Sequence, residues 1–433
     1  MTKQTTVRLP DQLADDAETV ARVRGGSLNQ LIIDSLAAEI ERSGVFPNDD
    51  LFPKFCEHGL WGLLIPKRHG GLGLTTKQYL PFLAEFSKVA GVVRVLLHVH
   101  NTSARAVASY GTKAQKEKLL PALARGDSSL TFAITEPNSG SGMDVACRAV
   151  RDGDEWVVTG SKHYITNAGL ADLHLVCCRT GAPGERRDRR ALSALVISTD
   201  TPGFTIEPMP HLMGNNGPHH GILSFDGARV PVESMIGAEG DGLEVFLGEL
   251  EPSRAFVAAS SLGAAERALE IALDFSKRRV TFSKTIAERP SIQAELAEMA
   301  RDVYALRLIL EDVADKLDKN EDCALEASIA KLTGLETVMR VTDKALDVVG
   351  GRAYFADYPY PLERIYREAR INLAEEGTPS IQRLVMARAL LDKPTPLAIG
   401  TLGTPYQPAG TDPALGQNPP PDLSYAHDPK NAK

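Results

Sequence analysis

Residues 349–383 read VGGRAYFADYPYPLERIYREARINLAEEGTPSIQR, and the spacing of the motifs within this stretch decides the fold. A glycine pair, Gly350-Gly351, opens it, and arginine-rich segments follow. Near its end, Glu375-Glu376-Gly377-Thr378 places two carboxylates side by side ahead of Ile381-Gln382-Arg383. If both carboxylates faced one pocket, each would raise the pKa of the other and so strengthen it as a base.

The rest of the chain changes its residue pattern twice. Residues 11–130 carry apolar side chains at helical spacing. From Leu130 to about Gly237, short β-branched runs, among them 155–160 and 192–198, alternate with turns. From Asp241 to Leu391 the pattern is helical again, with alanine and leucine repeating through 258–277, 292–317 and 324–349. We therefore predict an α+β fold in the order helices, strands, helices, with a central barrel or sandwich and a final helical bundle.

The predicted divisions follow these changes. They are an N-terminal segment at 1–43, a helical domain at 44–129, a β domain at 130–240, a helical bundle at 241–392 and a tail at 393–433. The tail is rich in proline and poor in aromatic residues, so it cannot bury enough apolar surface to offset its chain entropy. We predict that it is disordered or loosely draped.

Composition excludes several classes of protein. The chain has 433 residues, of which 43% are hydrophobic and 24% charged, which is the balance of a multi-domain globular protein. No apolar run approaches the roughly 20 residues of a membrane helix. The net charge of −8 repels nucleic acid on average, and the five cysteines are scattered without metal-ligand spacing. We expect a protein of the cytoplasm, with no metal site.

Three further motifs lie upstream of the first. Thr135-Glu136-Pro137 leads into Ser139-Gly140-Ser141, a turn of small residues through which N–H groups and hydroxyls can approach a pyrophosphate or a ring edge. Tyr164-Ile165-Thr166-Asn167 ends a predicted strand. Residues 278–286, RRVTFSKTI, end a predicted helix with two arginines.

Together the four motifs resemble those of the acyl-CoA dehydrogenase family of flavoenzymes, over roughly residues 44–392. The family pattern for the first stretch is GG, YP, ER-x-YR-D-AR and then EGT-x-x-IQR. The resemblance implies a fold with an N-terminal helical domain, a central β-barrel domain and a C-terminal four-helix bundle. It implies FAD as the cofactor and an acyl thioester, on CoA or on a carrier protein, as the substrate.

The resemblance also assigns site residues. The residues expected to bind FAD are Thr135, Ser141, Tyr164, Thr166, Arg279, Phe282, Gly350, Gly351 and Thr378. Those expected at the substrate are Arg254, Glu375 and Gly377. Thr166 would hydrogen-bond the flavin N5, and Arg279 would reach the FAD of a neighbouring subunit, which implies a homotetramer or at least a dimer. Glu376 takes the position of the catalytic base, and Glu251 with Arg254 is predicted to form an ion pair at a helix start.

The chemistry of the implied reaction explains why a carboxylate is needed. Desaturation removes an α-proton and a β-hydride from a thioester, and the α C–H is a very weak acid. Charge that develops on the thioester oxygen needs preorganised donors. A carboxylate shielded by flavin and acyl chain has a raised pKa and is a stronger base. Some family members place the base on the first bundle helix, where this chain has Ser253, so Glu376 is the candidate here.

Several positions depart from the family pattern. Asp347 stands where a glutamine is usual, Ser283 replaces a glycine, His220 replaces a threonine, and Glu375 replaces a tyrosine beside the base. These departures keep open an oxidase or monooxygenase of the same fold, or an enzyme that acts on a carrier-protein thioester. The electron acceptor would be an electron-transfer flavoprotein or oxygen.

Residues 5–43 carry a second resemblance. A polar–apolar alternation at 5–10 precedes two helices that Asp11 and Ser27 can cap, which is similar to a ribbon-helix-helix unit whose paired strands enter the DNA major groove. Thr6 and Arg8 would then face the bases. The alternative is the helical pair that the enzyme family carries before Phe46-Pro47. A regulatory protein that binds DNA through residues 5–43 is therefore the hypothesis of another class, which the net negative charge disfavours.

Overall fold

The structure is a computed structural model that describes residues 40, 43, 48–140, 144–181, 189–217, 220–356 and 360–392. The predictions for residues 5–39, for Ser141, for Tyr358-Pro359 and for the tail from 393 onward lie outside these residues. Met1–Met386 forms one compact unit, which contains all the predicted site residues. Of the second unit, Ala387–Lys433, only the end of one helix is described.

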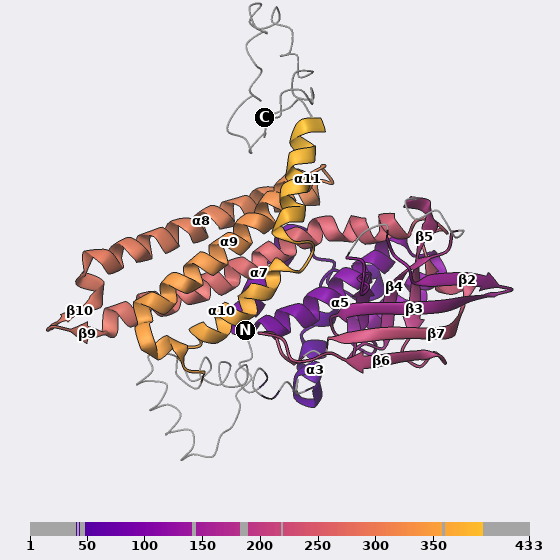
Figure 1. The fold of residues 1–433 in the computed structure, drawn as a ribbon, viewed down its shortest axis with the longest axis horizontal. Helices are drawn as coiled ribbons and strands as arrows, with labels where there is room; N and C mark the ends of the chain where they lie inside the picture. The colour runs from indigo at the N-terminus through magenta and orange to yellow at the C-terminus, as the bar shows by residue number, and fades with distance from the viewer. Residues whose placement is uncertain are drawn as a thin grey trace, which may run out of the picture. The chain divides into compact units, whose positions relative to one another are not determined.

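The first described elements are helical (Figure 1). They are α3 (Asn48–Glu57), α4 (Thr76–Val89), α5 (Gly91–Tyr110) and α6 (Lys113–Arg125). Thr75 and Thr112 begin α4 and α6 with capping boxes, in which the threonine hydroxyl and a glutamine three residues later satisfy each other's backbone N–H groups. Most of α5 is buried, including Arg94 and His98. This helix therefore brings charged and titratable groups into the interior.

One mixed sheet forms the middle of the chain. Its strands are β1 (Leu130–Ala133), β2 (Arg148–Asp152), β3 (Glu155–Ile165), β4 (Leu173–Arg179), β5 (Leu192–Ser198), β6 (Phe204–Pro208), β7 (Gly221–Pro231) and β8 (Met235–Ile236). The strand order is β6-β7-β3-β2-β4-β5-β8, with β1 beside β4. Among the described residues the path is open at β6 and β8, so hydrogen bonds do not close the sheet into a barrel. The β3–β7 register is irregular between Lys162 and Ile165, which is where Tyr164 adopts a positive φ of 59°.

Long helices form the C-terminal part. α7 (Gly242–Arg278), α8 (Pro290–Asp318) and α9 (Ala324–Val349) run side by side in Figure 1, followed by α10 (Leu362–Arg370) and α11 (Pro379–Asp392). A hairpin of β9 (Val280–Thr281) and β10 (Lys284–Thr285) connects α7 to α8. No helix in the described ranges is both long and apolar enough to cross a membrane.

The helices before and after the sheet share one apolar core. Tyr79 and Leu83 of α4 belong to the same buried cluster as Phe256 of α7 and Leu306 of α8. Close approach of α4 and α7 requires Gly263, because a Cβ there would lie 1.9 Å from the carbonyl oxygen of Ala84. The α+β fold with helices on both sides of a sheet domain in sequence is thereby confirmed, and it brings α5, α7, α9 and the Glu376 turn together.

Candidate active site

The turn that carries Glu376 is held in an unusual backbone conformation. Glu376 and Gly377 have positive φ angles of 53° and 93°. A non-glycine residue in this region costs on the order of 1–3 kcal/mol and persists only where its surroundings fix it. Two buried side chains do so: Lys331 Nζ of α9 donates to the carbonyl oxygens of Glu375 and Gly377, and Gln382 Nε2 donates to those of Glu376 (2.9 Å) and Gly377 (3.1 Å). The glutamine of the Ile-Gln-Arg motif therefore acts by holding the turn.

Glu376 itself receives a hydrogen bond from the first bundle helix. Ser253 Oγ of α7 donates to Glu376 Oε1 at 2.8 Å, and His98 Nε2 of α5 lies 2.7 Å from Ser253 Oγ. Burial raises the pKa of Glu376 to about 7, and the negative charge of Glu375 adds to this, while Ser253, Lys331 and Arg254 act to lower it. A carboxylate with this pKa is half ionised near neutral pH, where it can act as a general base.

Glu375 faces a different partner. Its carboxylate accepts two hydrogen bonds from the guanidinium of Arg94, at 2.7 and 3.2 Å, and the pair is largely buried. Burial acts to raise the pKa of Glu375, but the charge of Arg94 and its hydrogen bond hold it below its ordinary value. Glu375 is therefore an ionised partner of α5, and it influences Glu376 through its charge rather than as a second base.

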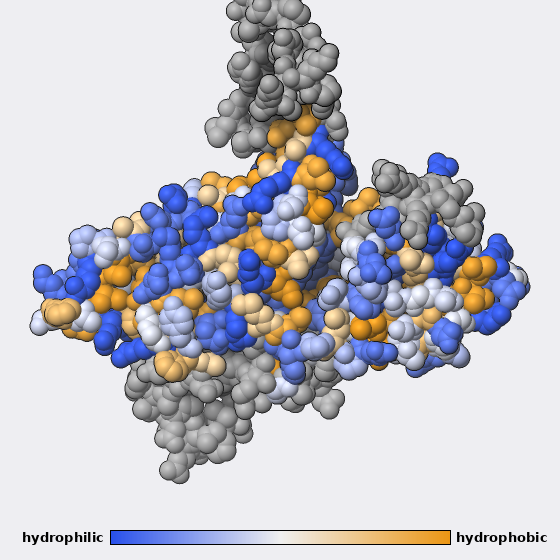
Figure 2. Space-filling model, viewed as in Figure 1, coloured by the Kyte–Doolittle hydropathy of each residue, from blue (hydrophilic) through white to orange (hydrophobic). Residues whose placement is uncertain are grey.

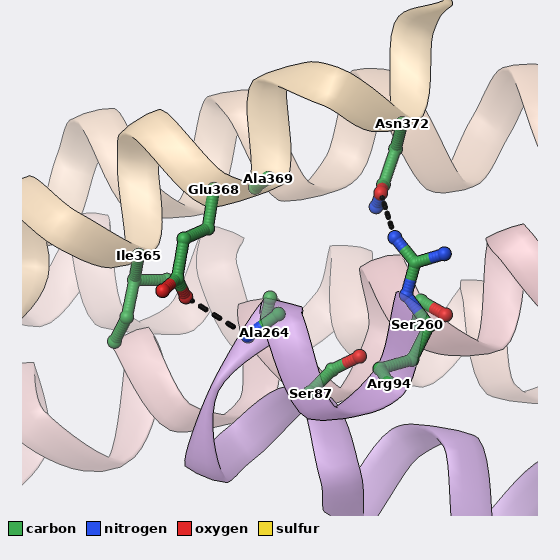
Figure 3. Close-up of a pocket in the computed structure, with 9 residues that line it drawn as sticks. Ser87, Arg94, Ser260, Ala264, Ile365, Glu368, Ala369 and Asn372 are labelled. Atoms are coloured by element: carbon green, nitrogen blue, oxygen red, sulfur yellow. Dashed lines mark hydrogen bonds between the residues drawn. The ribbon is translucent and has the colours of Figure 1, made fainter. Parts of the chain in front are cut away.

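A small polar cavity lies beside Arg94 (Figure 3). Its walls come from α4, α5, α7, α10 and the segment after α10, and they include Ser87, Ser260, Glu368 and Asn372. Figure 3 shows the Arg94 guanidinium directed at Asn372, whose Oδ1 accepts from Nη2 at 2.8 Å. Glu368 accepts from the Gly91 N–H at 3.0 Å. These contacts tie the segment leading to Glu376 to the start of α5.

Three of the residues predicted to bind flavin lie where β1 and β3 end. The His163 N–H donates to the Thr135 carbonyl at 2.8 Å, so the Thr135 turn lies alongside the end of β3. Tyr164 is 63% exposed there, and the half-buried Thr166 follows it. Thr166 Oγ1 is 3.0 Å from His220 Nε2, so the histidine that departs from the family pattern contacts this hydroxyl. An exposed ring beside hydroxyls fits a flat ligand with hydrogen-bonding edges, as a flavin is.

A buried ion pair between Lys162 and Glu136 stabilises the turn that carries Thr135. Lys162 Nζ of β3 lies 2.7 Å from Glu136 Oε1, with exposures of 0% and 6% for the two side chains. The Glu136 carboxylate also accepts from the N–H groups of Ala146 (2.7 Å) and Cys147 (2.9 Å). Glu136 of the Thr-Glu-Pro motif thus fixes the backbone on both sides of the turn.

The other predicted FAD residues lie on exposed or open backbone. Arg279 is exposed at the end of α7, and Phe282 is 92% exposed at the β9–β10 turn, with the Arg289 guanidinium 5.5 Å from its ring centroid. Gly350 has a φ of 70°, and apart from their chain neighbours no atom of the described residues lies within 4 Å of a Cβ built on it or on Gly351. Thr378 is exposed at the start of α11. Within the described part of the chain, no hydrogen bond or ring contact joins these residues to Thr135, Tyr164 or Thr166.

Arg254 differs from its prediction in one respect. Its Nε is buried and makes no hydrogen bond among the described residues, and no ion pair with Glu251 forms there. Burial lowers the pKa of Arg254, while the charges of Glu251 and Glu376 act to raise it. The ion pair at a helix start is therefore wrong: α7 begins at Gly242, well before either residue, and Glu251 instead accepts from Cys323 Sγ at 3.7 Å. Arg254 remains a positive charge near Glu376.

Sequence reasoning did not find Arg94, His98 or Lys331. All three are buried, with exposures of 2% in each case. The available signal was charge or imidazole within an otherwise apolar helix, as at Lys331 among Ala327, Ala330 and Gly334. Pairing such residues across helices requires the fold.

Replacement of Glu375 by glutamine is expected to lower the free energy of unfolding by about 2 kcal/mol, because it leaves the buried Arg94 charge without a counter-ion. The loss is less than for a fully buried pair, since 22% of the Glu375 side chain is exposed. Removing the negative charge beside Glu376 should also lower the Glu376 pKa. Chemical denaturation measures the first effect. The matched double variant Arg94→Met/Glu375→Gln should recover most of the stability; equal losses in both would contradict the pairing.

Comparison with known proteins identifies the family to which this arrangement of helices and sheet belongs. The family described as "Acyl-CoA dehydrogenase, N-terminal domain" matches residues 28–127, the middle domain matches 131–228, and the C-terminal domain matches 240–391. The first match takes in the second of the two helices on which the ribbon-helix-helix hypothesis depends. The three matches follow the order of helices, sheet and helices described above.

Individual relatives lead to the same family assignment. An acyl-CoA dehydrogenase of Bacillus subtilis (strain 168) is 36% identical over 358 residues, which are 82% of this chain and 93% of the relative. The structure of butyryl-CoA dehydrogenase from Megasphaera elsdenii superposes with a TM-score of 0.79 at 30% identity, covering 89% of this chain and all of that one. The structure of a prolyl acyl carrier protein oxidase superposes with a TM-score of 0.77 at 27% identity, covering 88% of this chain and 100% of that one. This chain therefore belongs to the acyl-CoA dehydrogenase family, oxidoreductases that act on CH–CH groups.

Proposed function

We propose that the protein is an FAD-dependent dehydrogenase that introduces an α,β double bond into an acyl thioester, with Glu376 as the base. The observation that carries this proposal is the Glu376 carboxylate itself. This carboxylate lies on a turn whose positive φ angles are fixed by hydrogen bonds from Lys331 and Gln382. Its pKa of about 7 suits proton abstraction near neutral pH.

The residues at the ends of β1 and β3 support FAD as the cofactor. Thr135, Tyr164 and Thr166 offer two hydroxyls and an exposed aromatic ring on adjoining backbone segments. When bound, FAD supplies the acceptor for the β-hydrogen and its electron pair. We expect Arg279, Phe282, Gly350, Gly351 and Thr378 to complete the site. The open space around the glycine pair allows close approach of a ligand to the backbone.

The chain's own residues would then perform the proton chemistry. The α C–H bond breaks, its proton passes to the Glu376 carboxylate, and its electron pair becomes the second bond between the α- and β-carbons. Charge on the thioester oxygen needs a donor during this step. The backbone N–H of Glu376 makes no hydrogen bond within the described ranges, and it is our candidate for that donor.

The purified protein is expected to carry a flavin absorbance that disappears when a suitable acyl-CoA is added without oxygen. The physical reason is that removal of both hydrogens from the thioester leaves two electrons on the bound flavin. Titration with acyl-CoA thioesters of increasing length, beside carrier-protein thioesters of the same acyl groups, measures this. Bleaching by carrier-protein thioesters alone would assign the carrier alternative, which the similarity to a prolyl acyl carrier protein oxidase favours. No bleaching by any thioester would contradict the proposal.

We also propose a homo-oligomer, in the form of a tetramer or at least a dimer, and an electron-transfer flavoprotein as the acceptor. Phe282 on the hairpin and Ile381 and Leu384 on α11 are exposed apolar side chains, and apolar surface is visible over α11 in Figure 2. Such surface favours association with another chain. Rapid oxygen consumption during turnover would assign an oxidase instead. The scattered cysteines support the cytoplasm as the location.

A further inference from the structure

A buried hydrogen-bonded chain leads away from Glu376 into the helices. It runs from Glu376 Oε1 to Ser253 Oγ (2.8 Å) and from Ser253 Oγ to His98 Nε2 (2.7 Å). Ser253 is fully buried and His98 is 2% exposed. The chain joins the turn after α10 to α7 and then to α5, so three separate segments meet at the oxygen of one serine.

The number of hydrogens in this chain fixes its direction. A serine hydroxyl has one hydrogen, and an ionised carboxylate can only accept. While Glu376 is ionised, Ser253 must therefore donate to it, and Ser253 Oγ must accept from His98. His98 then carries its hydrogen on Nε2, which leaves Nδ1 unprotonated. In agreement, Nδ1 has no hydrogen-bond partner within the described residues.

Burial is the main reason that His98 stays neutral. Burial lowers the pKa of His98 to about 3, and the nearby charge of Arg94 contributes, while Glu375 acts in the opposite direction. The ring also packs edge-on against Phe256, with 5.7 Å between centroids. His98 therefore supplies a neutral N–H donor and does not take up the proton that reaches Glu376.

We propose that Ser253 and His98 are positioning residues for the catalytic base: they orient the Glu376 carboxylate and stabilise its ionised form through a donor chain that points toward it. This inference rests on the proposed role of Glu376 as the base. The other charged groups that face Glu376 are Glu375 on the same turn, Lys331 on α9 and Arg254 on α7. Since Glu375 and burial oppose ionisation, the Ser253 hydroxyl offsets part of their effect.

The test measures the pKa of Glu376 directly, in the purified flavin-loaded protein, by infrared difference spectroscopy of the carboxyl group across pH. The variant Glu376→Gln assigns the band. Ser253→Ala is expected to raise the Glu376 pKa by about one unit or more, because the ionised form loses its donor. His98→Leu should raise it by about half as much through loss of the second donor, and His98→Gln, whose amide N–H can replace Nε2–H, should restore most of the wild-type value.

A matched control lies on the same helix. Ser276 is equally buried, and its hydroxyl donates to the carbonyl of Leu273 at 2.8 Å, so Ser276→Ala should leave the Glu376 pKa unchanged. A Ser253→Ala pKa equal to the wild type, or one that falls, overturns the proposal, as does a His98→Gln shift as large as that of His98→Leu. The proposed function fails separately: the shifts would then be present, but no thioester would bleach the flavin of the wild-type protein.

Discussion

The substitution Glu376→Gln is expected to lower the rate at which an acyl thioester reduces the bound flavin, about 10²–10⁴-fold. The substitution keeps the size of the side chain and a group that can accept from Ser253 Oγ, but an amide cannot remove a proton. Lys331 and Gln382 hold the turn through its backbone carbonyls, so the turn should stay in place. Anaerobic stopped-flow absorbance with saturating thioester measures the rate.

Two controls separate chemistry from assembly in this experiment. Flavin content should match that of the wild-type protein, because Glu376 belongs to no predicted FAD contact. Glu376→Asp keeps a carboxylate on a shorter side chain and should retain more activity than Glu376→Gln. If Glu376→Gln reduced the flavin at the wild-type rate, another group would be the base, and Glu376 would be excluded from that role.

Replacement of Lys162 by methionine is expected to lower the free energy of unfolding by about 3–5 kcal/mol, the cost of leaving a buried carboxylate unpaired. Both partners of the Lys162–Glu136 pair are almost fully buried, and Lys162 Nζ also donates to the Ile134 carbonyl at 3.1 Å. Because Glu136 fixes the turn that carries Thr135, the variant should also retain less flavin. Urea denaturation and the ratio of flavin to protein absorbance measure the two effects.

The double variant Lys162→Met/Glu136→Gln tests the physical cause. It removes both charges, so it should be more stable than Lys162→Met alone, although the N–H groups of Ala146 and Cys147 then lose a charged acceptor. A double variant that is less stable than the single one would show that the hydrogen bonds from the Ala146 and Cys147 N–H groups to the Glu136 carboxylate outweigh the cost of leaving that charge unpaired.

Local pattern predicted most elements of the fold. The run 192–198 is β5 as predicted, and the alanine-rich segment 324–349 is α9 with the predicted bounds. Periodicity failed at boundaries that depend on tertiary contacts. The predicted strand 155–160 continues to Ile165 as β3, because pairing with β7 extends it through an irregular register near Tyr164. α7 begins at Gly242, earlier than the repeat from residue 258 indicates, because it packs against several elements along its length.

The candidate site also combines residues that local motifs predict with partners that only the fold brings to them. Glu376, Thr135, Tyr164 and Thr166 were predicted from motifs, since a motif records local spacing. The partners that define their chemistry are distant in sequence: Arg94 for Glu375, His98 and Ser253 for Glu376, and Lys162 for Glu136. Glu375 is an example of a residue whose role needed the fold. Sequence reasoning expected Glu375 to raise the pKa of Glu376 if both faced one pocket, and only the structure shows that Arg94 holds Glu375 ionised while its charge still acts on Glu376.

Removal of the α-proton by Glu376 is the step on which the proposed function depends, and hydrogen exchange at the α-carbon reports on that step alone. An acyl-CoA that bleaches the flavin is incubated anaerobically with the enzyme in D2O, and deuterium at its α-carbon is followed by mass spectrometry. We predict that the wild-type protein incorporates deuterium and that Glu376→Gln does so at least about 100-fold more slowly. Incorporation by Glu376→Gln at the wild-type rate would show that a different group removes the proton.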